Sequence, residues 1–171
     1  KVYDKIYAAL AKDLKEAGIT DANIASFADT AMKDKWTPSD SKVITDFSSY
    51  TDSASLIAKA WEYNDAKDYA NARAFAQETI TRYADKAKEQ QASLTDYAAS
   101  GKEADYWALN DVATAYYIMA KSYKTEDNKT KAKENYNIII NDYSYAQCWD
   151  AQGWWWKVKK AAQDDLDAMG S

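Results

Sequence analysis

Two segments, sixty residues apart, share the pattern from which the fold is predicted: AWEYNDAKDYANARAFAQETITRY at 60–83 and AKSYKTEDNKTKAKENYNIIINDY at 120–143. Five positions match between them, and the matched pairs are Ala60 with Ala120, Tyr63 with Tyr123, Ala72 with Ala132, Ile80 with Ile140, and Tyr83 with Tyr143. Each stretch is typical of two helices joined by a short polar turn. We expect the small alanines to let the paired helices approach closely, while the tyrosine rings fill the space beside them.

Start and stop signals predict further helices around these stretches. In the central part, one helix is predicted from a cap at Asp52 or Ser53 to about Tyr63, and the next from about Asp68 into the nineties. A helix over 103–124 follows a capping-box pattern of Ser100 and Glu103. Two more helices are predicted over 130–142 and within about 154–168. The N-terminal part, 1–50, is expected to hold a helix over 2–17, a second capped by Thr20 or Asp21, and a short one after Pro38 that carries Val43, Ile44 and Phe47. The sequence therefore predicts seven or eight helices, no strand and one all-α domain over 1–171.

The composition limits the chemistry that the chain can perform. Histidine is absent, which excludes Ser-His-Asp and Cys-His catalysis and histidine-ligated metals. A single cysteine, Cys148, excludes an internal disulfide framework and any cysteine-based metal cage. We expect no cofactor and no enzymatic activity.

The charge limits the partners. The net charge is −5, and Arg73 and Arg82 are the only arginines, so the sequence predicts no nucleic-acid binding. No apolar run approaches the roughly 20 residues of a membrane span, so no transmembrane segment is expected.

The spacing of small and aromatic residues resembles the tetratricopeptide repeat (TPR), a helix–turn–helix unit of about 34 residues. The second stretch matches better, through Tyr116, Ala120, Tyr123, Ala132, Tyr136 and Tyr143. The first departs from the pattern because Phe75 lies one residue early and Ala76 takes the expected aromatic position. The resemblance implies an all-α, right-handed α-α superhelix with two degenerate TPR-like repeats over 53–147, followed by a Trp-rich closing helix over 148–171.

The closing segment, CWDAQGWWWK at 148–157, holds four tryptophans within eight residues. Consecutive residues of a helix point about 100° apart, so Trp154, Trp155 and Trp156 cannot all face one core. The segment is therefore either a stacking platform for a ligand or a bulky cap that closes the hydrophobic end of the repeats. Both interpretations stay open on the sequence.

TPR-like proteins tend to bind extended peptides along the face formed by the first helix of each repeat. The resemblance places that face on the exposed positions of 54–63 and 108–123. The candidate ligand-binding residues there and in the closing segment are Trp61, Trp107, Asn110, Tyr117, Lys121, Trp149, Trp154 and Trp156. Packing between helices is the alternative role for each aromatic residue among them.

These observations favour a non-enzymatic module or scaffold that binds a protein or an extended peptide. The alternative is a glycan-binding protein that stacks sugar rings on exposed tryptophans. An enzyme would instead need two convergent carboxylates, or a carboxylate with a lysine, in a deep pocket with perturbed pKa values. The 143–158 segment is also similar to the ends of exported bacterial TPR-like proteins, which implies a periplasmic, secreted or envelope-associated location.

Overall fold

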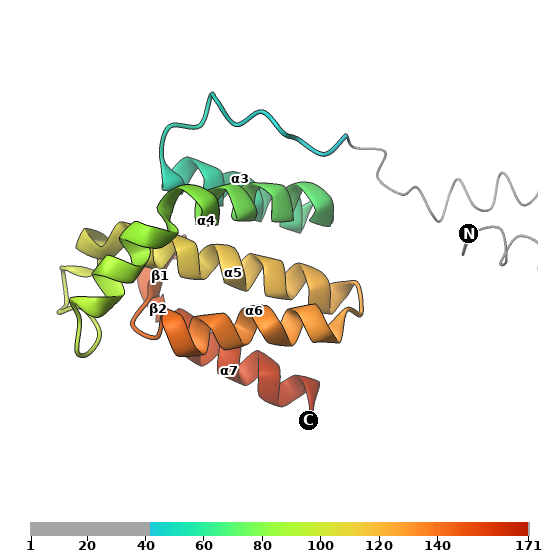
Figure 1. Ribbon diagram of the computed structural model, residues 1–171. Coiled ribbons are helices and arrows are strands. Elements are labelled where there is room, and N and C mark those ends of the chain that lie inside the picture. Colours follow the sequence, from blue (N-terminus) through green and yellow to red (C-terminus); the bar gives the residue numbers. More distant parts are fainter. Residues whose placement is uncertain (1–41, 171) are drawn as a thin grey trace, which may run out of the picture. The chain divides into compact units, whose positions relative to one another are not determined.

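The computed structural model describes residues 42–170, which are mostly helical; residues 43–170 belong to one unit (Figure 1). The elements are α3 (Ser53–Asp65), α4 (Tyr69–Ala92), a 3₁₀ turn η1 (Glu103–Tyr106), α5 (Trp107–Thr125), α6 (Lys129–Asp142), β1 (Gln147–Asp150), β2 (Trp154–Lys157) and α7 (Val158–Met169). Each α-helix packs on the α-helix that follows it in the chain, and α3 also packs on α5. The helices predicted within 1–41 lie outside the described residues.

The two repeated stretches form two helical hairpins, α3–α4 and α5–α6, as the sequence predicts. Asp68 caps α4 by accepting a hydrogen bond from Asn71 N, and Asn128 caps α6 by accepting one from Lys131 N. Asp52 caps α3 in the same way, through Ser55 N. These side chains satisfy backbone donors that a helix start leaves without partners, which explains why the predicted and observed starts agree.

The core runs along the inner faces of the helices. The four matched alanines, Ala60, Ala72, Ala120 and Ala132, have no exposed surface, which confirms their predicted burial. The largest fully buried side chains are Tyr136, Tyr143, Phe75, Leu56, Leu109, Ile118 and Ile139. Small and large residues thus alternate along the helix interfaces, as close packing requires.

The predicted Trp-rich closing helix is wrong. Trp149 and Trp154–Trp156 lie in an antiparallel β-hairpin, and α7 begins only at Val158. The turn of the hairpin is set by Gly153, whose φ of 102° is open to glycine and strained for other residues, and whose N–H donates to Asp150 O. Because successive residues of a strand point to opposite faces, the hairpin resolves the conflict that three consecutive tryptophans would create on a helix.

Two further expectations need correction. Val43, Ile44 and Phe47 belong to an extended segment rather than a short helix, because tertiary contacts hold it: Ile44 N donates to Asn71 Oδ1. Ser100 and Glu103 form no capping box, since the Glu103 carboxylate accepts from Gly101 N and a 3₁₀ turn precedes α5.

No helix among residues 42–170 is both long and apolar enough to cross a membrane.

Candidate functional site

Six of the eight candidate residues converge on one groove, although the sequence places them on three separate elements. The groove has a volume of about 760 Å³. Its walls are Trp61 and Asp65 of α3, Tyr117 and Lys121 of α5, Cys148, Trp149, Asp150, Ala151, Trp154 and Trp156 of the hairpin, and Ala161 of α7. We call it the tryptophan groove.

The strand register decides which hairpin residues share a face. Cys148 pairs with Trp156 and Asp150 pairs with Trp154, and residues directly opposite one another in an antiparallel pair lie on the same face. These four residues therefore form one side of the hairpin, and all of them line the tryptophan groove. Trp149 pairs with Trp155, their ring centroids 5.3 Å apart, and Trp149 also reaches the groove.

The rings form a connected series across the groove. Trp61 and Tyr117 lie 6.4 Å apart between ring centroids, and Tyr117 and Trp156 lie 5.4 Å apart. The Lys121 ammonium stands 5.7 Å from the Trp61 centroid and 5.6 Å from the Tyr117 centroid, within reach of a cation–π attraction to both. Trp154 is 49% exposed and Trp149 is 55% exposed, so large apolar surfaces face solvent here.

Tyr117 is held in place from behind by Asp165 of α7. The Tyr117 hydroxyl donates to Asp165 Oδ2 at 3.1 Å, Tyr136 donates to the same oxygen at 2.9 Å, and Lys124 Nζ donates to Oδ1 at 2.6 Å. Burial by itself would raise the pKa of Asp165, but the bonds from Lys124 and the two tyrosines outweigh it and the pKa lies below its ordinary value. These hydrogen bonds to Asp165 therefore connect Tyr117, which lines the groove on α5, with α6 and α7.

Cys148 does not supply a nucleophile at neutral pH. Burial raises the pKa of its thiol to about 11, against a smaller opposing effect of a hydrogen bond with Thr114. The thiol is therefore protonated and acts as a small apolar group on the hairpin face.

Asn110 does not join the groove. It is 6% exposed, its Nδ2 donates to Glu103 O at 2.8 Å, and its Oδ1 accepts from Gln147 N at 2.9 Å. Both halves of the amide are thus engaged inside the protein, where they fasten the start of β1 to α5. Its role in the structure is positional rather than ligand-facing.

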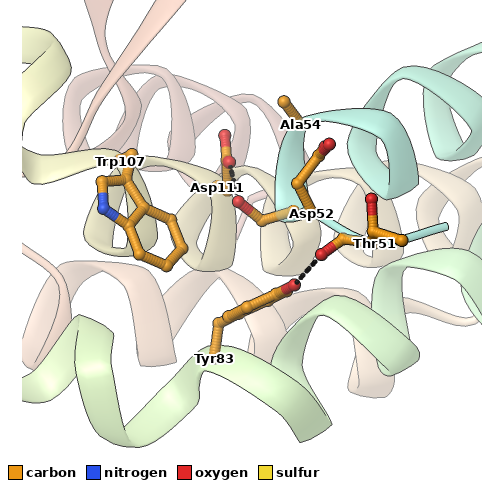
Figure 2. A pocket seen from close by; sticks show the side chains of 7 residues that line it. Thr51, Asp52, Ala54, Tyr83, Trp107 and Asp111 are labelled. Carbon is orange, nitrogen blue, oxygen red and sulfur yellow. Dashed lines mark hydrogen bonds between the residues drawn. The ribbon is translucent and has the colours of Figure 1, made fainter.

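Trp107 lies away from the groove, in a smaller pocket with Asp111 (Figure 2). Asp111 is not among the candidate residues predicted from the sequence. A signal was available, because Asp111 stands three residues after Ala108 and four before Ala115, both fully buried, so helical spacing places a carboxylate beside the buried face of α5.

Among the described residues, no group of three or more Cys, Asp or Glu side chains is placed to hold a metal ion. Comparison of the chain with protein-family models, with curated proteins and with solved structures gives no significant match. The resemblance to TPR proteins therefore stays a prediction.

Proposed function

We propose that the protein is a non-enzymatic binding module that holds an extended segment of a partner protein in the tryptophan groove. The observation that carries the proposal is the convergence of Trp61, Tyr117, Lys121, Trp154 and Trp156 on one open groove. Exposed aromatic rings of this kind give large apolar contact area at low cost in side-chain entropy, which is typical of interface hot spots.

The polar groups in the groove suit a peptide. Lys121 can donate to a backbone carbonyl or a carboxylate of the partner, while Asp65 and Asp150 can accept from its amides or pair with a basic side chain. Aromatic surfaces would then hold the apolar side chains between these polar contacts. We further propose a right-handed TPR-like superhelix, since α3 and α5 are the first helices of the two hairpins and both line the groove. A location in the bacterial envelope is part of the same proposal.

A glycan is the second candidate ligand. It is favoured by the exposure of Trp149 and Trp154, because the flat face of an indole stacks on the apolar face of a sugar ring. The two proposals differ in what the carboxylates and Lys121 contact, sugar hydroxyls in one case and peptide groups in the other.

The test is a selection from a random peptide display library with the full chain, run beside a glycan array. Trp154→Ala and Trp156→Ala should each weaken the selected peptide by about tenfold or more, as expected for an aromatic hot spot. Trp107→Ala is the matched control, because Trp107 is 43% exposed but lies outside the groove. Binding of glycans alone would overturn the peptide proposal, and equal losses in all three variants would overturn the assignment to the groove.

A further inference from the structure

The pocket beside Trp107 is a second concave site, formed where the start of α3, the middle of α4 and the start of α5 meet (Figure 2). Its volume is about 330 Å³, near the lower end of the range for small-molecule sites. The lining residues are Thr51, Asp52, Ser53, Ala54, Tyr83, Trp107 and Asp111. None of them belongs to the tryptophan groove.

Two aromatic rings form one corner of this pocket. Tyr83 and Trp107 lie 5.4 Å apart between ring centroids, at an interplanar angle of 81°. Figure 2 shows the indole on one side of the pocket and the Thr51–Ala54 segment on the other, with Tyr83 between them along one edge. The Tyr83 hydroxyl donates to Thr51 O, which fixes this ring, whereas the Trp107 indole keeps much of its surface open.

Two carboxylates share the pocket with the rings. Asp111 lies between the indole and the α3 segment and accepts a hydrogen bond from Ser53 Oγ. Asp52 uses Oδ1 to accept from Ser55 N at the start of α3. The partial positive charge of that helix end is therefore already met by Asp52, and Asp111 adds a second negative charge.

Basic side chains do not neutralise these carboxylates from within the pocket, because none of the described residues that line it is a lysine or arginine. The nearby Arg82 is engaged elsewhere, with Glu78 and with the carbonyl oxygens of Phe47 and Tyr50. The pocket thus combines open aromatic surface with two carboxylates that face no basic side chain among the described residues of its lining.

We propose that this pocket binds a small organic cation through an alkylated ammonium group, which would lie on the Trp107 and Tyr83 rings and beside Asp111 and Asp52. Aromatic surface attracts a cation through the negative face of the ring, and alkyl groups on nitrogen gain from apolar contact at the same time. A carboxylate supplies the opposite charge. An inorganic metal ion fits less well, because indole and phenol rings are poor metal ligands.

The electrostatics of Asp111 agree with this assignment. The pKa of Asp111 is raised to about 6, because the raising effects of burial and of the Asp52 charge together exceed the lowering effect of the hydrogen bond from Ser53. The titratable groups around Asp111 are Asp52 before α3, Tyr83 on α4 and Cys148 on β1, whose own pKa is raised in part by Asp111. A bound cation favours the ionised carboxylate, so binding near pH 6 should release protons and weaken as the pH falls.

The experiment titrates the full chain with choline and with its neutral isostere, 3,3-dimethylbutan-1-ol, by isothermal calorimetry at pH 7.5. Choline should bind about tenfold or more tightly than the alcohol, since the two differ mainly in charge. Calorimetry near pH 6 in buffers of different ionisation enthalpy should show proton release. Equal binding of the two ligands, or no binding of choline, overturns the proposal.

Variants assign the binding to this pocket. Trp107→Ala and Asp111→Asn should each weaken choline about tenfold, the second while keeping an oxygen for Ser53. Asp52→Asn should weaken it several-fold without loss of fold, because asparagine caps a helix as well as aspartate does. Trp154→Ala is the control for the tryptophan groove and should leave choline binding unchanged. If Trp154→Ala abolishes binding and Trp107→Ala does not, the cation site lies in the groove and the proposal fails.

A second arm identifies the source of the ammonium group. A short peptide with one trimethyl-lysine is compared with choline on the wild type and on Trp107→Ala. Choline binding at least as tight as that of the peptide supports a free small molecule. Much tighter binding of the peptide, lost in Trp107→Ala, would show that the ligand is a modified protein side chain and not a free small molecule.

Discussion

The turn between α3 and α4 and the turn between α5 and α6 use the same three backbone hydrogen bonds, displaced by sixty residues. In the first turn, Ala66 N donates to Glu62 O, Lys67 N to Asn64 O and Asp68 N to Tyr63 O. In the second turn, Glu126 N donates to Ser122 O, Asp127 N to Lys124 O and Asn128 N to Tyr123 O. Lys67 and Asp127 also share a positive φ, of 63° and 59°. The local sequence thus builds one turn twice.

The surroundings of the two turns differ. In the first hairpin Tyr63 stacks on Phe75 at 5.5 Å, and Phe47 and Tyr50 of the preceding extended segment each contact the same ring at 5.0 Å. In the second hairpin Tyr123 lies under the cations of Arg73 and Lys131, at 4.6 and 5.2 Å.

The aromatic residue of the second hairpin's second helix is Tyr136, and it is bonded to Asp165. The first hairpin is therefore closed by apolar contact and the second by a polar network. The same turn can serve both, because what covers a hairpin depends on the segment that the rest of the chain brings to it.

The largest change in stability is expected in the first helical hairpin, α3–α4, which is closed by apolar contact. Phe75→Ala should lower the free energy of unfolding by about 3–5 kcal/mol, since it empties a fully buried aromatic site. Urea denaturation followed by circular dichroism measures it. Phe47→Ala is the control, because Phe47 is only partly buried and its removal affects the covering segment alone. Equal losses in the two variants would show that Phe75 is not the centre of this core.

The polar hairpin should respond to Asp165→Ala with a loss of about 2–3 kcal/mol, because Lys124, Tyr117 and Tyr136 lose a common acceptor. The neighbouring Asp164→Ala, which breaks only an exposed pair with Lys160, should change stability little. Since the pKa of Asp165 is lowered by folding, its contribution is present above the ordinary carboxyl pKa and is lost as the pH falls through the lowered value. Acid titrations of wild type and variant should converge there, and parallel curves would contradict the network.

The contribution of Asp111 to stability should depend on pH in the opposite direction to that of Asp165. Its folded pKa of about 6 lies above the ordinary value, so the folded state is favoured by the protonated form and is weakened as the pH rises through about 6. Asp111→Asn should therefore raise the free energy of unfolding at pH 7 by about 1–2 kcal/mol and give no gain near pH 4. Thermal denaturation at the two pH values tests this. A gain of the same size at both would mean that charge is not the cause.

The smallest change in stability is expected from substitutions in the two turns themselves. Lys67→Gly and Asp127→Gly should each stabilise the protein by about 0.5–1 kcal/mol at most, since glycine adopts a positive φ without strain. Lys67→Gly should gain more, because aspartate tolerates this conformation better than lysine does. Thermal denaturation of the two variants measures the difference. A loss at either position would show that its side chain makes a stabilising contact.

Much of the helical framework could be predicted from the sequence, because its signals are local. Asp52, Asp68 and the turn before α6 mark helix starts through side chains that accept backbone N–H groups within three residues. The burial of Ala60 and Ala120 was expected from their matched positions in the two repeated stretches. The β-hairpin of β1 and β2 could not be predicted in the same way, since a short apolar run such as Trp154–Trp156 is compatible with either a helix or a strand. The turn at Gly153, with its positive φ, selects the strand.

The positions of the candidate binding residues could be predicted only in part. Trp61, Tyr117 and Lys121, which were expected on the face of the first helices, line the tryptophan groove, whereas Trp107 lies in another pocket. Asn110 was misassigned as a ligand contact because its two partners, Glu103 and Gln147, are not visible in a linear pattern.

Local sequence signals specify the two matched helical hairpins, their caps and their alanine-lined interfaces, since each depends on residues within a few turns of one another. Tertiary packing alone brings the tryptophan-bearing β-hairpin to one groove with α3 and α5, and brings Asp111 into one pocket with Trp107, Tyr83 and the start of α3. Those arrangements join residues that are distant in the chain: Tyr83 and Trp107 are 24 positions apart, and Trp61 and Trp156 are 95 positions apart. Their geometry is set by how the helices pack, which no local pattern encodes.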